Sequence, residues 1–228
     1  MIKAKKAAAS SKDAAAFRMH PDLPSEFSPV SSDEAEALST AREWSLAERS
    51  LSGVSFATTQ LSKFTAESCV FEQVSFNEAK IESMRCKDVV FANCDLANLH
   101  VRKLFGTRIE FKNCRLTGVR LIESESKDLL ISGGDERYAQ FRFSTIESAE
   151  FEGCNFEESD FYGAKLKRVK FSGCNLRSAE MSDVTLTEVD LRGSTVEGLK
   201  VKAEDIRGAI VDPGQALAFA HLLGIRIC

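Results

Sequence analysis

The sequence contains no apolar run that approaches 18 residues, so it gives no sign of a membrane-spanning helix. Its basic N-terminus also lacks an apolar stretch long enough for the core of a secretory signal. Neither sign of charge is in large excess: 34 acidic residues against 30 basic ones leave a net charge of −4, which does not indicate direct binding to nucleic acid. We therefore expect a cytoplasmic protein that binds neither a membrane nor a nucleic acid.

Residue patterns for catalysis and metal binding are missing as well. The chain has no glycine-rich phosphate loop, no HExxH zinc motif and no nucleophile elbow. Its three histidines, His20, His100 and His221, are scattered along the sequence. Seven cysteines are present, and an odd number in a chain without an export signal indicates reduced thiols. We predict a protein that is not an enzyme and needs no metal or cofactor.

A five-residue repeat is what the sequence has in abundance. Every fifth position from residue 46 to residue 206 carries a large apolar residue in 28 of 33 cases. The five exceptions are Ala66, Cys86, Gly106, Ser126 and Glu136. This period fits neither the turn of a helix nor the alternation of a strand, and self-similarity at a fixed period indicates a repeat architecture.

The repeats resemble those of a known family. The segments that carry the resemblance are CDLAN (94–98), CNFEE (154–158), SDFYG (159–163) and CNLRS (174–178). They are similar to the pentapeptide repeat family, and the likeness covers residues 46–211. It implies a right-handed quadrilateral β-helix in which four pentapeptides form one square coil. We therefore expect an all-β solenoid of about eight coils, with a short helix before it and a capping helix after it.

A period of 20 residues can be read from the sequence itself. Sorted by this period, one set of large positions is nearly all phenylalanine: Leu51, Phe71, Phe91, Phe111, Ile131, Phe151, Phe171 and Leu191. Two residues after each of these, the sequence has glycine or asparagine in seven cases of eight. Both residues tolerate a positive φ, which a tight turn requires. One corner of each coil is predicted there.

Four of the cysteines share one column of this arrangement, at Cys94, Cys114, Cys154 and Cys174. A zinc site would need four ligands that converge on one point, whereas this column is linear and has no histidine near it. We interpret these cysteines as small apolar residues that face into a narrow tube.

Two stretches break the pattern. At Ala66, Cys86 and Gly106 a small residue takes the large position, while Phe64, Met84 and Leu104 stand two residues earlier. This exchange is either drift within a tolerant core or a locally reshaped side. Residues 122–138 are the weakest part of the frame, and since a lone buried carboxylate is costly, Glu136 is predicted to turn outward through a bulge or loop.

The two ends of the chain differ from the repeats. Residues 1–30 are rich in Ala, Lys, Ser and Pro and are predicted to form a flexible tail. Residues 31–45 are predicted to form a short helical cap, in which Ser31 and Glu34 make a capping box.

Residues 212–228 are predicted to form a second helix and a following strand, with Asp212 as N-cap and Pro213 at the first helical position. This helix is apolar nearly all round, so one side can cap the tube and another needs a partner chain. The ending resembles that of the gyrase-protecting pentapeptide repeat proteins, in which two tubes dimerise end to end. The dimer contacts that this implies are Leu217, Phe219, Ala220, Leu222 and Leu223; a monomeric cap is the alternative.

Function is expected on the outer faces, because the inward positions are filled. The resemblance implies a DNA mimic that binds DNA gyrase or topoisomerase IV and modulates the enzyme or protects it from a poison. The candidate acidic face, on the side that carries the cysteine column, consists of Asp95, Asp135, Glu157, Glu158 and Glu197. The following side is more basic, and its second candidate patch consists of Arg120, Arg142, Phe143 and Tyr162. A general protein-binding scaffold is the alternative.

Overall fold

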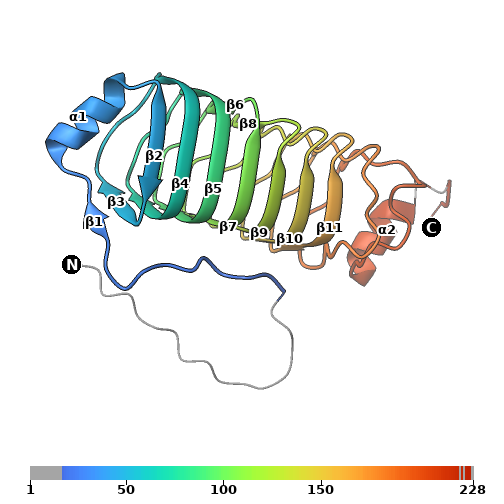
Figure 1. Ribbon diagram of the computed structural model, residues 1–228. Helices are drawn as coiled ribbons and strands as arrows, with labels where there is room; N and C mark the ends of the chain where they lie inside the picture. The colour runs from blue at the N-terminus through green and yellow to red at the C-terminus, as the bar shows by residue number, and fades with distance from the viewer. Residues whose placement is uncertain (1–16, 221, 223, 227–228) are drawn as a thin grey trace.

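The computed structural model describes residues 17–220, 222 and 224–226 as a stack of parallel coils with a short helix at each end (Figure 1). The helices are α1 (Ser32–Thr40) and α2 (Pro213–Ala220). The strands are β1 (Ser28–Pro29), β2 (Glu43–Ala47), β3 (Arg49–Ser52), β4 (Gln60–Glu72), β5 (Lys80–Ala92), β6 (His100–Val101), β7 (Leu104–Lys112), β8 (Arg120–Leu121), β9 (Glu125–Ser132), β10 (Thr145–Glu152) and β11 (Lys165–Ser172).

Neighbouring coils pair residue by residue at a spacing of 20. Phe71 lies opposite Phe91, and Phe91 lies opposite Phe111. The main path through the sheet is β1-β3-β4-β5-β7-β9-β10-β11. The predicted β-solenoid is therefore confirmed, with about seven turns in place of eight. The last coils are joined by isolated bridges, such as Asp190 with Ile210, and not by strands, which accounts for the lower count.

The interior of the tube is packed by the predicted apolar columns. The rings of Phe71, Phe91 and Phe111 stack with centroids 4.8 and 4.9 Å apart, which matches the spacing of ~4.8 Å between paired strands. All three rings are buried. Burying such a ring contributes on the order of 2–3 kcal/mol, so this column alone is a major source of stability.

The cysteine column lies in the same interior. Cys94, Cys114, Cys154 and Cys174 are free, buried thiols. Each Sγ donates to the carbonyl of the residue 23 positions earlier, for example Cys94 to Phe71 at 3.4 Å and Cys154 to Ile131 at 3.2 Å. The thiols therefore act as small core groups whose weak donors are satisfied by the coil next to them.

The corners of the coils explain both the glycine and asparagine column and the exchanged positions. Every member of that column, from Gly53 to Gly193, has a positive φ. A second corner turns at Glu123 and Phe143 with a positive φ, whereas residues 63, 83 and 103 have none. In the first two of these coils one strand runs on through the corner, as the 13 residues of β4 and of β5, whereas at residue 103 the corner separates β6 from β7. The exchange of large and small residues therefore marks a locally reshaped side.

The prediction that Glu136 turns outward is wrong. Its side chain lies inside the tube and is 0% exposed. One carboxyl oxygen, Oε2, accepts from the backbone N–H of Asn155 at 3.1 Å, and Oε1 has no partner. Gly134 makes the space, because a Cβ there would lie 1.8 Å from Oε1. The five-residue repeat therefore continues through this coil without a bulge. Burial raises the pKa of Glu136 to about 8.

The N-terminal prediction is wrong for residues 17–30, while residues 1–16 lie outside the described part of the chain. Residues 17–27, which we call the strap, run back along one edge of the solenoid (Figure 1). Arg18 of the strap is buried. The capping box of Ser31 and Glu34 is present, but α1 ends at Thr40 and the segment from Glu43 is already the first strand of the stack.

At the other end, α2 covers the last coil. The Asp212 carboxylate accepts from the N–H of Gln215 at 3.0 Å, and the Gln215 side chain accepts from the Asp212 N–H at 3.0 Å. The Gln215 amide also donates to the carbonyls of Leu191 and Ser194 at 2.6 and 2.7 Å. These bonds fix the helix to the tube by satisfying backbone acceptors that the last coil leaves open.

Candidate interaction faces

The five carboxylates of the candidate acidic face lie on the outer surface of the side that carries the cysteine column. Three of them form ion pairs with arginines of the same side. Asp95 pairs with Arg115 at 2.6 Å, Asp135 with Arg137 at 2.8 Å, and Glu197 with Arg177 at 2.8 Å. Sequence reasoning counted these arginines but could not place them against the carboxylates.

These pairs change the electrostatics of the acidic face. The hydrogen bond and charge of Arg137 hold the pKa of Asp135 below its usual value. Burial alone would raise the pKa of Asp95, but hydrogen bonds from Arg115 and from a backbone N–H outweigh it, and the pKa is lowered. No ion pair within 4.0 Å involves Glu157 or Glu158 in the described part of the chain. Free negative charge on this face is therefore concentrated at these two residues.

The second candidate patch is a compact cluster on the next side of the tube. The Arg142 guanidinium lies 5.6 Å from the Phe143 ring centroid and 5.2 Å from that of Tyr162. The two rings meet edge to face at 5.6 Å. Arg120 lies two coils below Asp160, which pairs with Arg142 at 3.5 Å. Phe143 is 52% exposed, so the cluster presents an aromatic surface with an arginine at its centre.

Tyr138, at the preceding corner of the same coil, is a further exposed aromatic residue and is 51% exposed. It occupies a positive-φ position with a φ of 61°, where a bulky side chain is uncommon. The sequence signal that could have found it is a tyrosine in a corner column that elsewhere holds small or polar residues such as Asn98 and Gly118.

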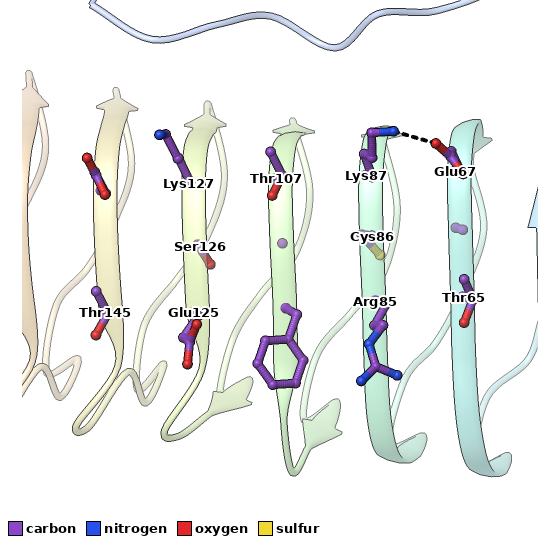
Figure 2. A pocket seen from close by; sticks show the side chains of 14 residues that line it. Thr65, Glu67, Arg85, Cys86, Lys87, Thr107, Glu125, Ser126, Lys127 and Thr145 are labelled. Atoms are coloured by element: carbon purple, nitrogen blue, oxygen red, sulfur yellow. Dashed lines mark hydrogen bonds and ion pairs between the residues drawn. The ribbon is translucent and has the colours of Figure 1, made fainter.

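A shallow trough of about 450 Å³ runs along the outside of the reshaped side (Figure 2). Its walls are two rows of outward side chains, with Thr65, Arg85 and Glu125 in one row and Lys87 and Lys127 in the other. These rows contain three cationic and three anionic side chains, and Lys87 pairs with Glu67 at 2.6 Å. This balance gives the trough no preference for a ligand of one charge.

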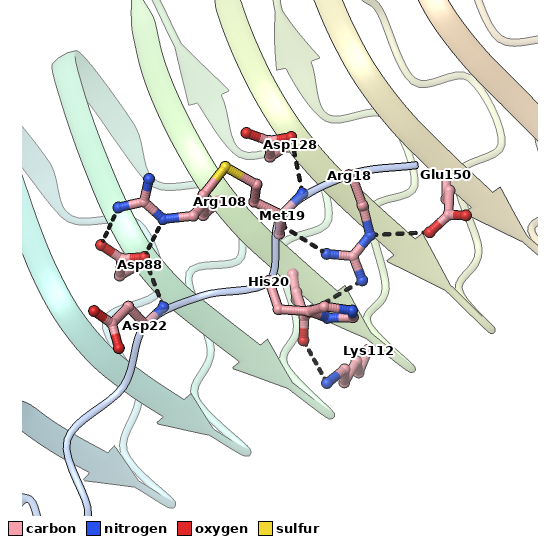
Figure 3. Close-up of polar contacts among 10 residues, drawn as sticks. Arg18, Met19, His20, Asp22, Asp88, Arg108, Lys112, Asp128 and Glu150 are labelled. Carbon is pink, nitrogen blue, oxygen red and sulfur yellow. Dashed lines mark hydrogen bonds and ion pairs between the residues drawn. The ribbon is translucent and has the colours of Figure 1, made fainter. Parts of the chain in front are cut away.

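The strap covers a line of four carboxylates, which we call the acidic edge: Asp88, Glu110, Asp128 and Glu150. They come from four successive strands of the stack, β5, β7, β9 and β10. Arg18 reaches Glu110 at 2.9 Å and Glu150 at 3.1 Å (Figure 3). Sequence reasoning missed this contact, because nothing in the tail's composition indicates partners about 100 residues away.

Backbone groups of the strap complete the contact. The N–H of Met19 donates to Asp128 at 2.9 Å, and the N–H of Asp22 donates to Asp88 at 2.7 Å (Figure 3). Burial alone would raise the pKa of Glu110, but hydrogen bonds from Lys112, Arg18 and His20 outweigh it, and the pKa lies below its usual value. Glu110 is therefore held ionised beneath the strap.

The C-terminal end has an apolar outer surface. Leu217 of α2 is 60% exposed and Ile225 is 53% exposed, whereas Phe219 is buried against the last coil. Ala220 and Leu222 are half-buried, and Leu223 lies outside the described residues. Of the residues predicted for a dimer contact, Leu217 therefore faces away from the tube, and Phe219 serves the cap.

Neither helix of the described chain is long and apolar enough to cross a membrane. Within the same residues, no group of three or more His, Cys, Asp or Glu side chains is placed to hold a metal ion.

Comparison with known proteins agrees with this architecture. The family described as "Pentapeptide repeat region" matches residues 84–161 and 144–209, which together exceed half of the chain. A parallel solenoid of 20-residue coils with one turn every five residues defines a repeat protein of this class. The chain belongs to the pentapeptide repeat family. A comparison with functionally curated proteins gives no significant match.

Solved structures that are similar to this chain include the following two. One is HetL, a pentapeptide repeat protein involved in heterocyst differentiation regulation from the cyanobacterium Nostoc sp. strain PCC 7120: 16% identity over 78% of this chain and 95% of that one, TM-score 0.35. The other is full-length QnrB1, a plasmid-mediated fluoroquinolone resistance protein: 18% identity over 80% of this chain and 100% of that one, TM-score 0.28. Likeness at this level carries no functional conclusion.

Proposed function

We propose that the chain is a non-catalytic binding protein that occupies the DNA-binding surface of a type II topoisomerase, DNA gyrase or topoisomerase IV. The observation that carries the proposal is a filled rod with outward carboxylates along one side, where Asp95 and Asp135 lie two coils apart, as do Glu157 and Glu197 by their 40-residue spacing. A rod of this kind can present charge in the way a duplex does. The effect on the enzyme would be to modulate it or to protect it from a poison.

The magnitude of the charge limits how far the mimicry is electrostatic. Seven coils at about 4.8 Å each make a rod of roughly 35 Å, and a duplex of that length carries roughly 20 phosphates. On the acidic face only Glu157 and Glu158 are free of arginine partners. Shape and direct contact must therefore supply most of the affinity, with charge setting orientation.

A two-fold dimer through the C-terminal end belongs to the same proposal, because two rods joined end to end would span twice the length. Its support is the exposed apolar surface of Leu217 and Ile225. An apolar surface of this kind at the end of a rod is typical of a contact between chains.

A supercoiling assay with purified gyrase tests the proposal. The wild-type chain should inhibit supercoiling or restore it in the presence of a fluoroquinolone. The double variant Glu157→Lys/Glu158→Lys should lose at least tenfold in potency. The matched control Glu152→Lys/Glu188→Lys reverses two exposed carboxylates on other parts of the rod and should retain potency. Equal loss in both variants, or no effect of the wild type on either enzyme, would contradict the proposal.

A general protein-binding scaffold is the second candidate, and the cluster of Arg142, Phe143 and Tyr162 favours it. Exposed aromatic rings around an arginine are typical of the central contacts of protein interfaces. On this alternative, Phe143→Ala and Tyr162→Ala would abolish capture of the cellular partner, while Glu157→Lys/Glu158→Lys would not.

A further inference from the structure

The strap is bound to the rod almost entirely through polar groups. Met19 is 58% exposed, and Leu23 and Phe27 are only half-buried, so the strap inserts no large apolar anchor into the tube. What holds it is the Arg18 guanidinium and the backbone N–H groups of Met19 and Asp22. Backbone N–H groups are common to all peptides, so the Arg18 guanidinium, which pairs with two carboxylates, is the main specific element of this contact. The His20 ring, with Nδ1 3.1 Å from Glu110, and the Phe17 ring, 5.8 Å from the Arg168 guanidinium, add to it.

The acidic edge is arranged as a receptor for an extended chain. Its carboxylates come from four successive coils, which lie ~4.8 Å apart, and an extended peptide that crosses them advances ~3.3 Å per residue. Residues 18 to 22 of the strap therefore suffice to pass from Glu150 to Asp88. At the far end, the Arg168 guanidinium donates to the carbonyl of Phe17 at 3.1 Å. Both backbone donors and backbone acceptors of the bound segment are thus recognised.

The strap covers these carboxylates and supplies part of their charge balance. Asp88, Glu110 and Asp128 are each at most 4% exposed because the strap lies over them. Arg108 holds Asp88 with two bonds of 2.5 and 2.6 Å, and Lys112 reaches Glu110 at 2.5 Å. Glu150 receives its ion pair from Arg18. Removal of the strap would expose these carboxylates to water and would not leave them buried and unpaired, so a cation on another segment can take the place of Arg18.

We propose that the acidic edge is a binding site for an extended, arginine-bearing peptide segment of a partner protein, and that residues 17–22 occupy this site in cis. The site lies on a different edge of the rod from the acidic face, so it does not depend on topoisomerase binding. The tethered strap competes at an effective concentration on the order of millimolar, so a partner binds when the strap is displaced.

The experiment uses the full chain and a fluorescein-labelled synthetic peptide of residues 15–24 as the probe. Fluorescence anisotropy should show binding to the Arg18→Glu protein at least tenfold tighter than to wild type, whose own strap blocks the site. A probe that carries Arg18→Glu should not bind. Adding Glu110→Gln and Glu150→Gln to the Arg18→Glu protein should weaken binding of the normal probe at least tenfold.

Arg102→Glu is the matched control, because Arg102 is an exposed arginine that pairs with Glu82 elsewhere on the rod. It should behave as wild type. Hydrogen exchange should show loss of amide protection at Met19 and Asp22, whose N–H groups donate to the acidic edge, in Arg18→Glu and not in Arg102→Glu. Met19→Pro, which removes the N–H that Asp128 accepts, opens the site independently if Arg18→Glu fails to fold. Equal probe binding to wild type and to both strap variants, or binding unaffected by the Glu110 and Glu150 changes, would overturn the proposal.

Discussion

Replacing Glu136 by glutamine removes a carboxyl group that lies deep in the described tube while keeping the shape of the side chain. The wild-type carboxyl is wholly buried, has one oxygen without a partner, and has Cys154, Cys174 and Asp135 as its nearest titratable neighbours. Burial raises its pKa from the usual 4.5 to about 8. In the unfolded chain the same group ionises near 4.5, so folding and proton binding are linked.

The direction in which stability changes with pH follows from the order of the two pKa values, because the folded-state pKa lies above the unfolded-state pKa. Below pH 4.5 the carboxyl is protonated in both states, and its full contribution to stability is present. Between pH 4.5 and about 8 only the unfolded chain releases the proton, so the free energy of unfolding falls by about 1.4 kcal/mol per pH unit. The whole loss is on the order of 5 kcal/mol and is complete above about pH 8.

Urea unfolding at pH 5, 6, 7 and 8 measures this loss. Trp44, the single tryptophan, is buried at the start of the stack and reports unfolding by fluorescence, with circular dichroism as a second probe. The difference between wild type and Glu136→Gln isolates the carboxyl, because all other groups titrate in both proteins. Glu152→Gln, at an exposed position, is the control. If the free energy of unfolding changed with pH in the same way for wild type and Glu136→Gln, the raised pKa of Glu136 would be contradicted.

Three further predictions concern packing, thiols and assembly. Phe151→Ala should cost about 3–5 kcal/mol in urea unfolding, whereas Glu152→Ala, the exposed neighbour, should cost less than about 0.5 kcal/mol; similar losses at both positions would contradict the inward frame. The four column thiols should resist brief alkylation of the native protein, and rapid labelling in mass spectrometry would contradict their burial; they are Cys94, Cys114, Cys154 and Cys174. By light scattering, Leu217→Asp should give a monomer with an unchanged melting temperature, while Phe219→Asp should lower that temperature by uncapping the tube; a monomeric wild type at micromolar concentration would end the dimer proposal.

The solenoid could be predicted from the sequence because its rule is local. Each inward position repeats after five residues, and each coil pairs with the next at a fixed step of 20, so Phe71, Phe91 and Phe111 must stack once the frame is found. The corner column could be predicted for the same reason, since a positive φ selects glycine and asparagine. The same pattern of inward and corner residues therefore recurs in successive coils, and each coil supports the prediction separately.

The features that could not be predicted depend on contacts outside one repeat. Glu136 points inward because Gly134 leaves a space that only the folded tube defines. The strap depends on pairing Arg18 with Glu110 and Glu150, at sequence separations of 92 and 132. The pairing of Asp95 with Arg115 also joins neighbouring coils, and it neutralises a carboxylate that composition alone counts as free charge.

Competition with duplex DNA tests most directly whether the chain occupies the DNA-binding surface of the topoisomerase. Labelled DNA bound to gyrase is titrated with the unlabelled wild-type chain, and anisotropy is followed at several salt concentrations. We predict complete displacement of the DNA. The chain concentration at the midpoint should be at least fivefold higher for Glu157→Lys/Glu158→Lys. We also predict a log–log salt slope of about 2 for binding of the rod, far below the slope of about 10 that extensive phosphate contacts give. DNA that remains bound while the chain binds the same enzyme would contradict the proposal.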